Sequence, residues 1–402
     1  MNKDKVPRPE RLSQLVGQPV EAIVTPALVV DLDAMERNLT RMAEFAKKHN
    51  VRLRPHAKTH KSAVIAKLQM QAGAVGMCVQ TLAEAEALAQ RGVTDIFITN
   101  QIVSPAKLLR AVAVAQLLTQ TNGKLAITVD SALGVTRLAQ AQVQAGGPRC
   151  VIDVLVEIDV GHNRCGVAPG EAALTLARQI SLFDGLHFAG LHAYNGRTQH
   201  TRTAQGRRDA VSVAVQDAVY TRQLIEDAGI KVDLITGAGT GSFMLEAASG
   251  VYGELQPGSY LFMDVDYAKN ERDAAQPNFE QALFVKTQVI SVRPELAGGH
   301  AVCDAGHKSH AVESGLPLVH PLGAGMGDDY ALEYFKSADE HGMLRAAGSA
   351  TRLPALGQML WLIPGHCDPT VHLHDFMIGV RGGLLHGTVE RILRVDARGA
   401  VA

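Results

Sequence analysis

The sequence predicts an α/β protein with an N-terminal (β/α)8 barrel of the TIM type and a C-terminal, mostly antiparallel β domain. Eight short runs rich in β-branched residues occur before about residue 268, and helical or polar segments separate them. Eight is the number of parallel strands that closes such a barrel. After residue 268 the pattern changes to alternating strands with little helical periodicity, which favours a second, mostly antiparallel domain.

The segments between the predicted barrel strands have the character of crossover helices. Residues 81–91 and 207–228 both carry apolar residues three and four positions apart, the spacing of an amphipathic helix. The eight predicted strands are Val51 to Pro55, Val75 to Gln80, Asp95 to Asn100, Leu125 to Asp130, Asp153 to Asp159, Phe188 to Tyr194, Val232 to Thr236 and Glu254 to Asp264.

One extra strand and one extra helix precede the barrel. The apolar run Ala27 to Val30 predicts the strand, and apolar residues from Met35 to Phe45 repeat at helical spacing, with Asp33 as the expected N-cap. We expect this leading unit to cover one end of the barrel.

The C-terminal part of the chain predicts at least one hairpin. Arg381-Gly382-Gly383 is a glycine turn between Phe376 to Val380 and Leu384 to Val389. We expect two domains, a cofactor-binding barrel at residues 26–268 and a β-rich domain formed by residues 1–25 and 269–402. The other predicted strands of this domain are Leu283 to Val292, Ala301 to Asp304 and Gln358 to Ile363.

Composition indicates a globular protein that acts on a small molecule. The 402 residues are 47% hydrophobic and 20% charged with a formal net charge of -1, and no basic run suggests a nucleic acid or an anionic membrane as partner. No apolar stretch has the length of a membrane span, and the polar start indicates neither export nor insertion. Five scattered cysteines without a Cys-x-x-Cys pair argue against a disulfide framework, so we expect a cytoplasmic protein.

Polar residues gather at the carboxyl ends of the predicted strands. In a β/α barrel this rim carries the chemistry, because the connecting loops converge there on the barrel axis. The rim residues are Lys58, Gln80, Asn100, Asp130, Arg164, Tyr194, Thr240 and Ser259.

Lys58 has the position of a Schiff-base lysine, because it follows the first predicted strand and lies between His56 and His60. Such an amine needs a lowered pKa, which desolvation and the neighbouring charges of Arg54 and Lys61 would supply. The alternative is an ordinary solvated lysine.

The run Gly237-Ala-Gly-Thr-Gly-Ser242, hereafter the glycine loop, offers backbone N–H groups and two hydroxyls to a phosphate monoester. It matches neither the dinucleotide nor the Walker pattern, and a plain structural bend is the alternative. Gly258-Ser259 after the next strand strengthens the phosphate interpretation, because barrels of this type bind phosphate after strands seven and eight.

His366 and Asp368 would point to one side of an extended segment, whereas Cys367 would point to the other. An imidazole and a carboxylate suit manganese, magnesium or zinc, although a hydrogen-bonded His-Asp pair without metal is the alternative. Together with Lys58 and the glycine loop, the pair suggests pyridoxal 5'-phosphate (PLP) and a divalent metal, most simply Mn²⁺ or Mg²⁺.

Nearly the whole chain resembles the D-threonine aldolase and 3-hydroxy-D-aspartate aldolase family, relatives of D-serine dehydratase among the alanine racemase-like PLP enzymes of fold type III. The motifs that carry the resemblance are Thr25–Leu28, Arg54–Lys61, Glu157–Gly161, Arg164–Val167, Gly239–Ser242, Glu254–Tyr260, Met263–Tyr267 and Pro364–Thr370.

The resemblance implies a role for each candidate residue. Lys58 would form the Schiff base and act catalytically, and His366 with Asp368 would bind the metal. The remaining residues would bind the cofactor: Thr240, Gly258 and Ser259 at the phosphate, Tyr194 near the pyridine nitrogen, Arg164 near the ring, and Gln80 and Tyr267 elsewhere on it.

The implied reaction is metal-dependent retro-aldol cleavage of a D-3-hydroxy amino acid to glycine and an aldehyde, by a homodimer. Two alternatives are a 3-hydroxy-D-aspartate aldolase that releases glyoxylate and a dehydratase that acts on D-serine or 3-hydroxyaspartate; a non-catalytic PLP-binding protein is a more distant one. Asp368 favours the aldolase, since the dehydratase relatives typically have a cysteine as second metal ligand. His192 and His307 depart from the family pattern and are expected near the substrate.

Overall fold

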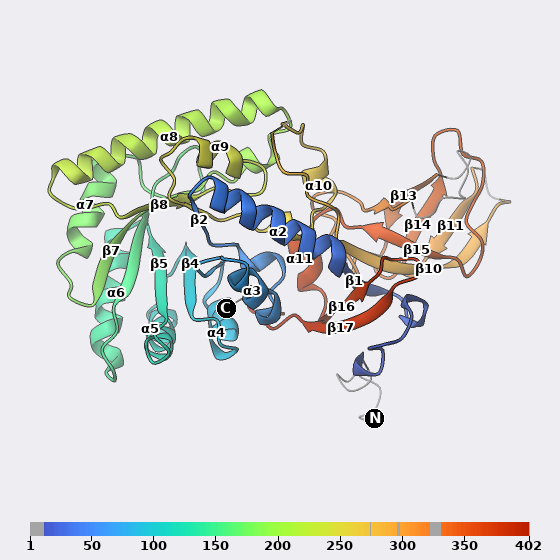
Figure 1. Cartoon of the computed structure of the whole chain (residues 1–402), viewed down its shortest axis with the longest axis horizontal. Helices are drawn as coiled ribbons and strands as arrows, with labels where there is room; N and C mark the ends of the chain where they lie inside the picture. The colour runs from blue at the N-terminus through green and yellow to red at the C-terminus, as the bar shows by residue number, and fades with distance from the viewer. Residues whose placement is uncertain (1–11, 274, 296–297, 322–330, 402) are drawn as a thin grey trace. The chain divides into compact units, whose positions relative to one another are not determined.

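The computed structural model describes residues 12–273, 275–295, 298–321 and 331–401 (Figure 1). The chain divides into two compact units. The barrel unit contains residues 40–258, 269–277 and the C-terminal end from Gly399, and the β unit contains the residues up to Leu39, residues 259–268 and residues 278–398. Among the described residues, no helix combines the length and the apolar character needed to cross a bilayer.

The barrel unit is built on eight parallel strands in the order β2-β9-β8-β7-β6-β5-β4-β3. A parallel bridge between His56 and Cys78 joins β2 to β3, and Val75 N donates to Leu53 O at 2.8 Å, so the ring of strands closes. The predicted fold class is therefore confirmed. The strands are β2 (Arg52–Leu53), β3 (Met77–Val79), β4 (Asp95–Gln101), β5 (Lys124–Val129), β6 (Ile152–Glu157), β7 (Leu186–Ala193), β8 (Leu234–Gly237) and β9 (Glu254–Leu255).

Helices connect successive strands on the outside of the barrel (Figure 1). Both predicted crossover helices are present, and Thr81 caps the first of them in a capping box with Glu84. The helices are α3 (Ala63–Gln71), α4 (Leu82–Gln90), α5 (Pro105–Thr119), α6 (Ala132–Ala145), α7 (Glu171–Ile180), α8 (Ala204–Asp227) and α9 (Phe243–Ala248), with 3-10 turns η3 (Ala57–Thr59) and η4 (Arg197–His200).

Several barrel strands are shorter than predicted, and proline explains this for β2 and β9. Pro55 follows β2 and Pro257 follows β9, and neither can donate a backbone hydrogen bond to a neighbouring strand. The predicted strand Glu254 to Asp264 therefore ends at Leu255, and its second half forms the 3-10 turn η5 (Ser259–Leu261).

The β unit contains a nine-stranded sheet in the order β13-β14-β11-β10-β1-β16-β17, in which β15 also pairs with β10 and β12. Within the described strands of this sheet, only the β1–β16 pairing is parallel. The unit also holds η2 (Val20–Ala22), α10 (Val265–Ala268) and α11 (Cys367–His372). The strands are β1 (Ala27–Asp31), β10 (Leu283–Arg293), β11 (His300–Cys303), β12 (Leu318–Val319), β13 (Leu332–Ser337), β14 (Gly342–Ala346), β15 (Met359–Ile363), β16 (Phe376–Arg381) and β17 (Thr388–Arg394).

The leading segment belongs to this sheet, because β1 pairs with β10 and β16. The following helix, α2 (Leu32–Lys48), starts earlier than predicted, since Asp31 Oδ1 accepts from Ala34 N at 3.0 Å. The expectation that Asp33 is the cap is therefore wrong. Its carboxylate instead accepts from Arg381 and from the Gly382 backbone.

Candidate active site

The predicted rim residues follow the strands as the sequence indicated. Lys58 lies in η3 after β2, Tyr194 directly follows β7, and Thr240 lies in the glycine loop after β8. Asn100 is an exception, because it lies within β4 just before its end. In the barrel unit the carboxyl ends of parallel strands share one edge, so Lys58, Gln80, Tyr194 and the glycine loop belong to one rim.

His56 fixes the backbone at Lys58. Lys58 N donates to His56 Nδ1 at 3.4 Å, so Nδ1 carries no proton and Nε2 must carry it. Nε2 then donates to Thr99 Oγ1 at 3.1 Å, and Thr99 Oγ1 donates to Val79 O at 3.1 Å. These hydrogen bonds run from β4 to the turn that presents Lys58, and apart from the proximity of His56 no sequence pattern indicates them.

The positive charges expected to act on Lys58 are already neutralised. Lys61 Nζ is paired with the buried carboxylate of Glu84. Arg54 is paired with Asp95 and, at 3.1 Å, with Glu254. Both cations are therefore balanced by carboxylates, which reduces the positive field that they can exert, and the lowered pKa of the Lys58 amine stays a prediction. Lys58 itself is half-buried.

The glycine loop and Gly258 lie close to neighbouring atoms, which leaves little room for larger side chains. Thr240 is 2% exposed, and Ala238 has a left-handed φ of 69°. A Cβ on Gly258 would lie 2.5 Å from Thr59 Oγ1, which has no hydrogen-bond partner among the described residues. A cradle of small residues with an unsatisfied buried hydroxyl nearby fits a bound phosphate group.

The remaining ring-contact candidates differ in burial. Gln80 Nε2 donates to Thr99 O at 3.5 Å, and Tyr194 is half-buried with its ring 6.3 Å from that of His192. Arg164 is exposed. Burial opposes ionisation of Glu157, but the nearby His192 ring, the hydrogen bond from Gln101 and the Arg164 charge keep the pKa of this carboxyl below its ordinary value.

The two residues that depart from the family pattern lie in different settings. His192 is 2% exposed, and its Nε2 is 3.2 Å from Gln256 Oε1 within the barrel. His307 is more exposed, and its Nε2 lies 3.0 Å from Asp339 Oδ1. The proximity of His192 and His307 to the substrate stays a prediction.

His366 and Asp368 face each other, although the local backbone differs from the prediction. Residues 366–368 begin helix α11 instead of continuing as an extended segment, because His366 is its N-cap and Asp368 lies in its first turn. His366 Nε2 and Asp368 Oδ2 are 4.0 Å apart. Two ligands about 2.1 Å from one octahedral cation are separated by about 3 to 4 Å, so the pair can share a metal ion.

Glu313 is a residue that the sequence did not single out. Its Oε1 lies 2.6 Å from His366 Nδ1, so the carboxylate occupies one ring nitrogen and leaves Nε2 directed at Asp368. Histidines that bind metals commonly have such a partner. In the described part of the chain, no group of three or more His, Cys, Asp or Glu forms a metal site, so a cation would take its further ligands from water or substrate.

Cys367 lies between the two candidate metal ligands in the sequence and is fully buried. Burial together with the Asp264 and Asp368 carboxylates raises the pKa of its thiol well above the ordinary value. The aldolase interpretation, in which Asp368 is the second ligand, is consistent with this burial.

Within the β unit, Ser259 and Tyr267 lie on a segment that is hydrogen-bonded to Gly365 and Cys367, next to the candidate metal ligands. Asp264 accepts from Tyr267 N at 2.9 Å and from Cys367 N at 3.0 Å. Asp266 N donates to Gly365 O at 3.1 Å. The segment that carries two predicted cofactor contacts is thereby fixed to the residues next to His366.

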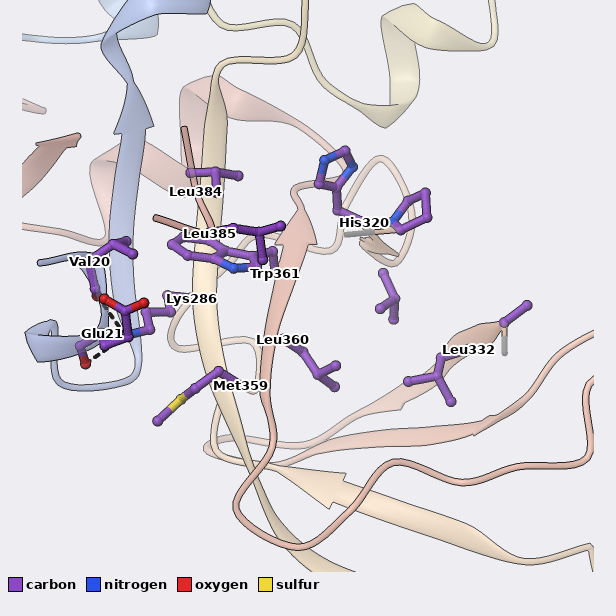
Figure 2. Close-up of a pocket in the computed structure, with 13 residues that line it drawn as sticks. Val20, Glu21, Lys286, His320, Leu332, Met359, Leu360, Trp361, Leu384 and Leu385 are labelled. Carbon is purple, nitrogen blue, oxygen red and sulfur yellow. Dashed lines mark hydrogen bonds between the residues drawn. The ribbon is translucent and has the colours of Figure 1, made fainter. Parts of the chain in front are cut away.

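A pocket of about 450 Å³ in the β unit contains none of the ten predicted site residues (Figure 2). It is lined mainly by apolar side chains, among them Trp361 and Leu384, together with the buried amine of Lys286. Lys286 Nζ donates to the carbonyl oxygens of Val20, Glu21 and Ile23 at 2.8 to 3.2 Å. With its three hydrogens engaged, Lys286 is not a competing Schiff-base lysine.

The chain is similar to known proteins over almost its full length. A family model of the alanine racemase N-terminal domain matches residues 30–266, and a serine dehydratase domain matches residues 282–380. The chain is 43% identical to a D-threonine aldolase of Arthrobacter sp, with 95% of each chain covered. It is 38% identical to a 3-hydroxy-D-aspartate aldolase of Paracoccus denitrificans (strain Pd 1222), over 96% of this chain and 95% of that one.

A solved structure is similarly close. The crystal structure of D-threonine aldolase from Filomicrobium marinum superposes with a TM-score of 0.88 at 43% identity, over 96% of this chain and 99% of the other.

Proposed function

The chain belongs to the D-threonine aldolase and 3-hydroxy-D-aspartate aldolase family of PLP-dependent carbon-carbon lyases, and we propose that it cleaves D-3-hydroxy amino acids of the D-threonine type with the help of a divalent metal. The observation that carries the proposal is the facing pair His366 and Asp368, 4.0 Å apart, with Cys367 buried between them in sequence. It provides an imidazole and a carboxylate for a hard cation.

We propose that Lys58 binds the cofactor aldehyde as a Schiff base. When bound, PLP supplies an electron-withdrawing imine that accepts the electron pair left on the α carbon when the bond to the β carbon breaks. The phosphate would be held by Thr240, Gly258 and Ser259. Two observations support this assignment: the buried hydroxyl of Thr59 has no hydrogen-bond partner among the described residues, and Gly258 has no side chain that would block the site. Gln80, Arg164, Tyr194 and Tyr267 would contact the rest of the cofactor.

The residues of the chain have three tasks in this scheme. Lys58 would hold the cofactor aldehyde until the substrate amine takes its place, and His56 fixes the Lys58 backbone. His366 and Asp368 would hold a cation, Mn²⁺ or Mg²⁺ by their chemistry, and such a cation would lower the pKa of the substrate β-hydroxyl. The arginine or tyrosine near the pyridine ring would not hold a proton on the ring nitrogen as an aspartate would, which limits delocalisation into the ring and makes the cation more important.

Two alternative reactions use the same residues. A 3-hydroxy-D-aspartate aldolase would release glyoxylate with glycine, and the 38% identity to such an enzyme supports it as the nearer alternative. A dehydratase acting on D-serine or 3-hydroxyaspartate would release ammonia, but the carboxylate of Asp368 argues against it, since by the resemblance the dehydratase relatives typically have a cysteine as second metal ligand. The family models match both units, which also argues against a non-catalytic PLP carrier, since the β unit carries the proposed metal pair.

By analogy with related enzymes we further propose that the protein is a cytoplasmic homodimer.

Product analysis tests the proposal. Purified enzyme with PLP and Mn²⁺ is expected to release glycine from D-threonine and none from L-threonine, and a chelator should reduce the rate to background. Lys58→Ala should lose the Schiff-base absorbance and the activity together. Ammonia without glycine would identify a dehydratase, and full activity in the chelated enzyme would refute the role of His366 and Asp368.

A further inference from the structure

Gln199 connects two loops of the barrel rim. It lies in η4, five residues after Tyr194, and it is 1% exposed. Its Nε2 donates to Asn195 O at 3.2 Å and to Ser242 Oγ at 2.8 Å, and its Oε1 accepts from Gly241 N at 2.8 Å. One buried amide therefore binds the segment after β7 and the glycine loop after β8.

The glycine loop is shaped around this side chain. A Cβ on Gly239 would lie 2.5 Å from Gln199 Oε1, and one on Gly241 would lie 3.0 Å from Gln199 O and 3.2 Å from Oε1. Contacts this short exclude other residues unless Gln199 moves. Two of the glycines are therefore explained by the close approach of Gln199.

The hydrogen-bond chain continues below the loop. Ser242 Oγ donates to Glu246 Oε1 at 2.7 Å, so the single hydroxyl proton is used and Gln199 must be the donor to Ser242. Glu246 is 4% exposed on α9, and its Oε2 has no hydrogen-bond partner among the described residues. The hydroxyl of Ser242 is thus directed away from the rim, and its role is to hold the loop.

We propose that Gln199 is a positioning residue for the cofactor phosphate, because it holds the glycine loop in the conformation that receives this group. The inference rests on the proposed function, since it presumes that the loop binds the phosphate of PLP. Preorganised backbone N–H groups bind an anion without paying to order the loop first. Without the Gln199 amide, Gly241 N and Ser242 Oγ would lose the partners that fix them.

Phosphate dependence separates this role from a general contribution to barrel stability. A glutamine that only stabilises the fold would affect binding of PLP and of pyridoxal, which lacks the phosphate, to the same extent. A glutamine that positions the loop affects only the ligand with the phosphate. The ratio of the two dissociation constants is therefore the decisive quantity.

The experiment compares full-length wild type, Gln199→Met and Gln142→Met after removal of the cofactor. Each is titrated with PLP and with pyridoxal, and the Schiff-base absorbance reports binding. Gln142 is the matched control, because its Nε2 also donates to a backbone carbonyl, Gly185 O at 2.7 Å, outside the rim. Methionine keeps the length of glutamine and removes its hydrogen bonds.

We expect Gln199→Met to weaken PLP binding about tenfold, because the glycine loop loses its two hydrogen bonds with Gln199, those of Gly241 N and Ser242 Oγ. Pyridoxal binding should stay unchanged within about twofold. Gln142→Met should leave both constants unchanged. Ser242→Ala, which removes the acceptor of one Gln199 hydrogen bond, is a milder variant and should weaken PLP binding about threefold to fivefold.

The outcomes distinguish the inference from the function on which it rests. If wild type forms no Schiff base or does not prefer PLP to pyridoxal, the proposed cofactor site is wrong. If wild type prefers PLP and the ratio of constants is unchanged in Gln199→Met, the positioning role of Gln199 is overturned. Should Gln199→Met not fold, an unchanged ratio in Ser242→Ala overturns it equally.

Discussion

Oε1 of Glu313 lies 2.6 Å from Nδ1 of His366. This contact fixes which ring nitrogen is available, because a proton shared with the carboxylate on Nδ1 leaves Nε2 as the acceptor that faces Asp368. Glu313 thereby orients the imidazole and increases its basicity toward a cation.

The first prediction concerns Glu313. Glu313→Ala should weaken Mn²⁺ binding by about tenfold, the lower end of the effect of such partners, because Glu313 is half-exposed. Isothermal titration calorimetry measures the Mn²⁺ affinity of each protein. Glu340→Ala, which removes an exposed carboxylate paired with Lys308, is the control and should bind Mn²⁺ like wild type. Equal affinity in all three proteins would show that Glu313 does not support the metal site.

His56 gives the second prediction. His56→Leu should slow Schiff-base formation at Lys58 by about fivefold, because the Lys58 backbone loses its acceptor. His56→Asn should retain most of the rate, since asparagine is also a good N-cap. Stopped-flow absorbance after mixing with PLP measures both rates. A rate for His56→Leu equal to that of His56→Asn would contradict the assigned role.

Glu246 gives a prediction with a definite pH dependence. Burial raises the pKa of this carboxyl from 4.5 to about 7, against the opposing hydrogen bond from Ser242. The folded protein therefore binds a proton that the unfolded chain releases, so this group's contribution to stability is complete below pH 4.5 and is lost as the pH rises to about 7. The loss is about 3 kcal/mol.

Glu246→Gln keeps the shape of the protonated side chain and cannot ionise. The stability of this variant relative to wild type should therefore increase between pH 4.5 and 7 and stay constant above it. Urea unfolding of both proteins at a series of pH values measures the difference. A difference that does not vary with pH would show that Glu246 titrates normally.

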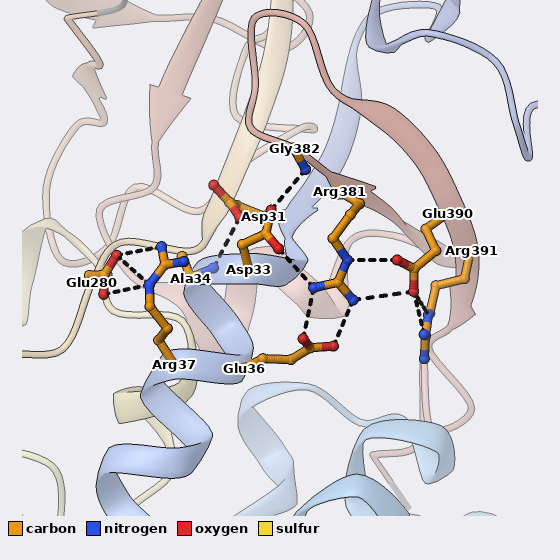
Figure 3. A network of polar contacts seen from close by, with 10 residues as sticks. All are labelled: Asp31, Asp33, Ala34, Glu36, Arg37, Glu280, Arg381, Gly382, Glu390 and Arg391. Carbon is orange, nitrogen blue, oxygen red and sulfur yellow. Dashed lines mark hydrogen bonds and ion pairs between the residues drawn. The ribbon is translucent and has the colours of Figure 1, made fainter.

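Arg381 connects three carboxylates of the β unit (Figure 3). Its guanidinium binds Asp33 at 2.9 Å, Glu36 at 2.7 Å and Glu390 at 2.6 Å. Together with Arg391 it lowers the pKa of Glu390 to about 2. The side chain of Arg381 therefore joins the start of α2 to the β16–β17 hairpin.

Arg381→Met should destabilise the β unit by about 1 to 2 kcal/mol, because several charges share one partly buried cation. The effect should shrink in high salt. Arg293→Met removes one exposed pair with Glu295 and should change stability much less than Arg381→Met, because solvent screens this pair. Thermal unfolding at low and high salt compares them, and equal effects of the two substitutions would mean that the Arg381 network adds nothing.

The barrel could be predicted from the sequence because each strand is a local apolar run at a regular interval. Strand lengths were less predictable, since Pro257 ends β9 well before the apolar run itself ends. Strands β12 to β14 were missed, because β13 and β14 alternate buried and exposed residues only weakly. The cap of α2 was misplaced by two residues because Asp31 and Asp33 are chemically equivalent, and only the fold decides that Asp33 binds Arg381.

The placement of the candidate residues at strand ends could be predicted, since a parallel barrel brings these ends to one rim. Their supporting partners could not. Glu313 reaches His366 across 53 positions, and Gln199 reaches Ser242 across 43. Contacts at such sequence distances leave no periodic pattern, and an ordinary glutamate or glutamine in a loop carries no signal of its own.

The pairing of β1 with β10 and β16 has a consequence for synthesis on the ribosome. Ala27–Asp31 emerges early, but its antiparallel partner is more than 250 positions further along and its parallel partner later still. The barrel strands are complete before either partner has left the exit tunnel. A nascent chain arrested after β9 should therefore expose the apolar segment Ala27–Asp31 without its strand partners. Chaperones that hold unfolded chains bind segments of this kind.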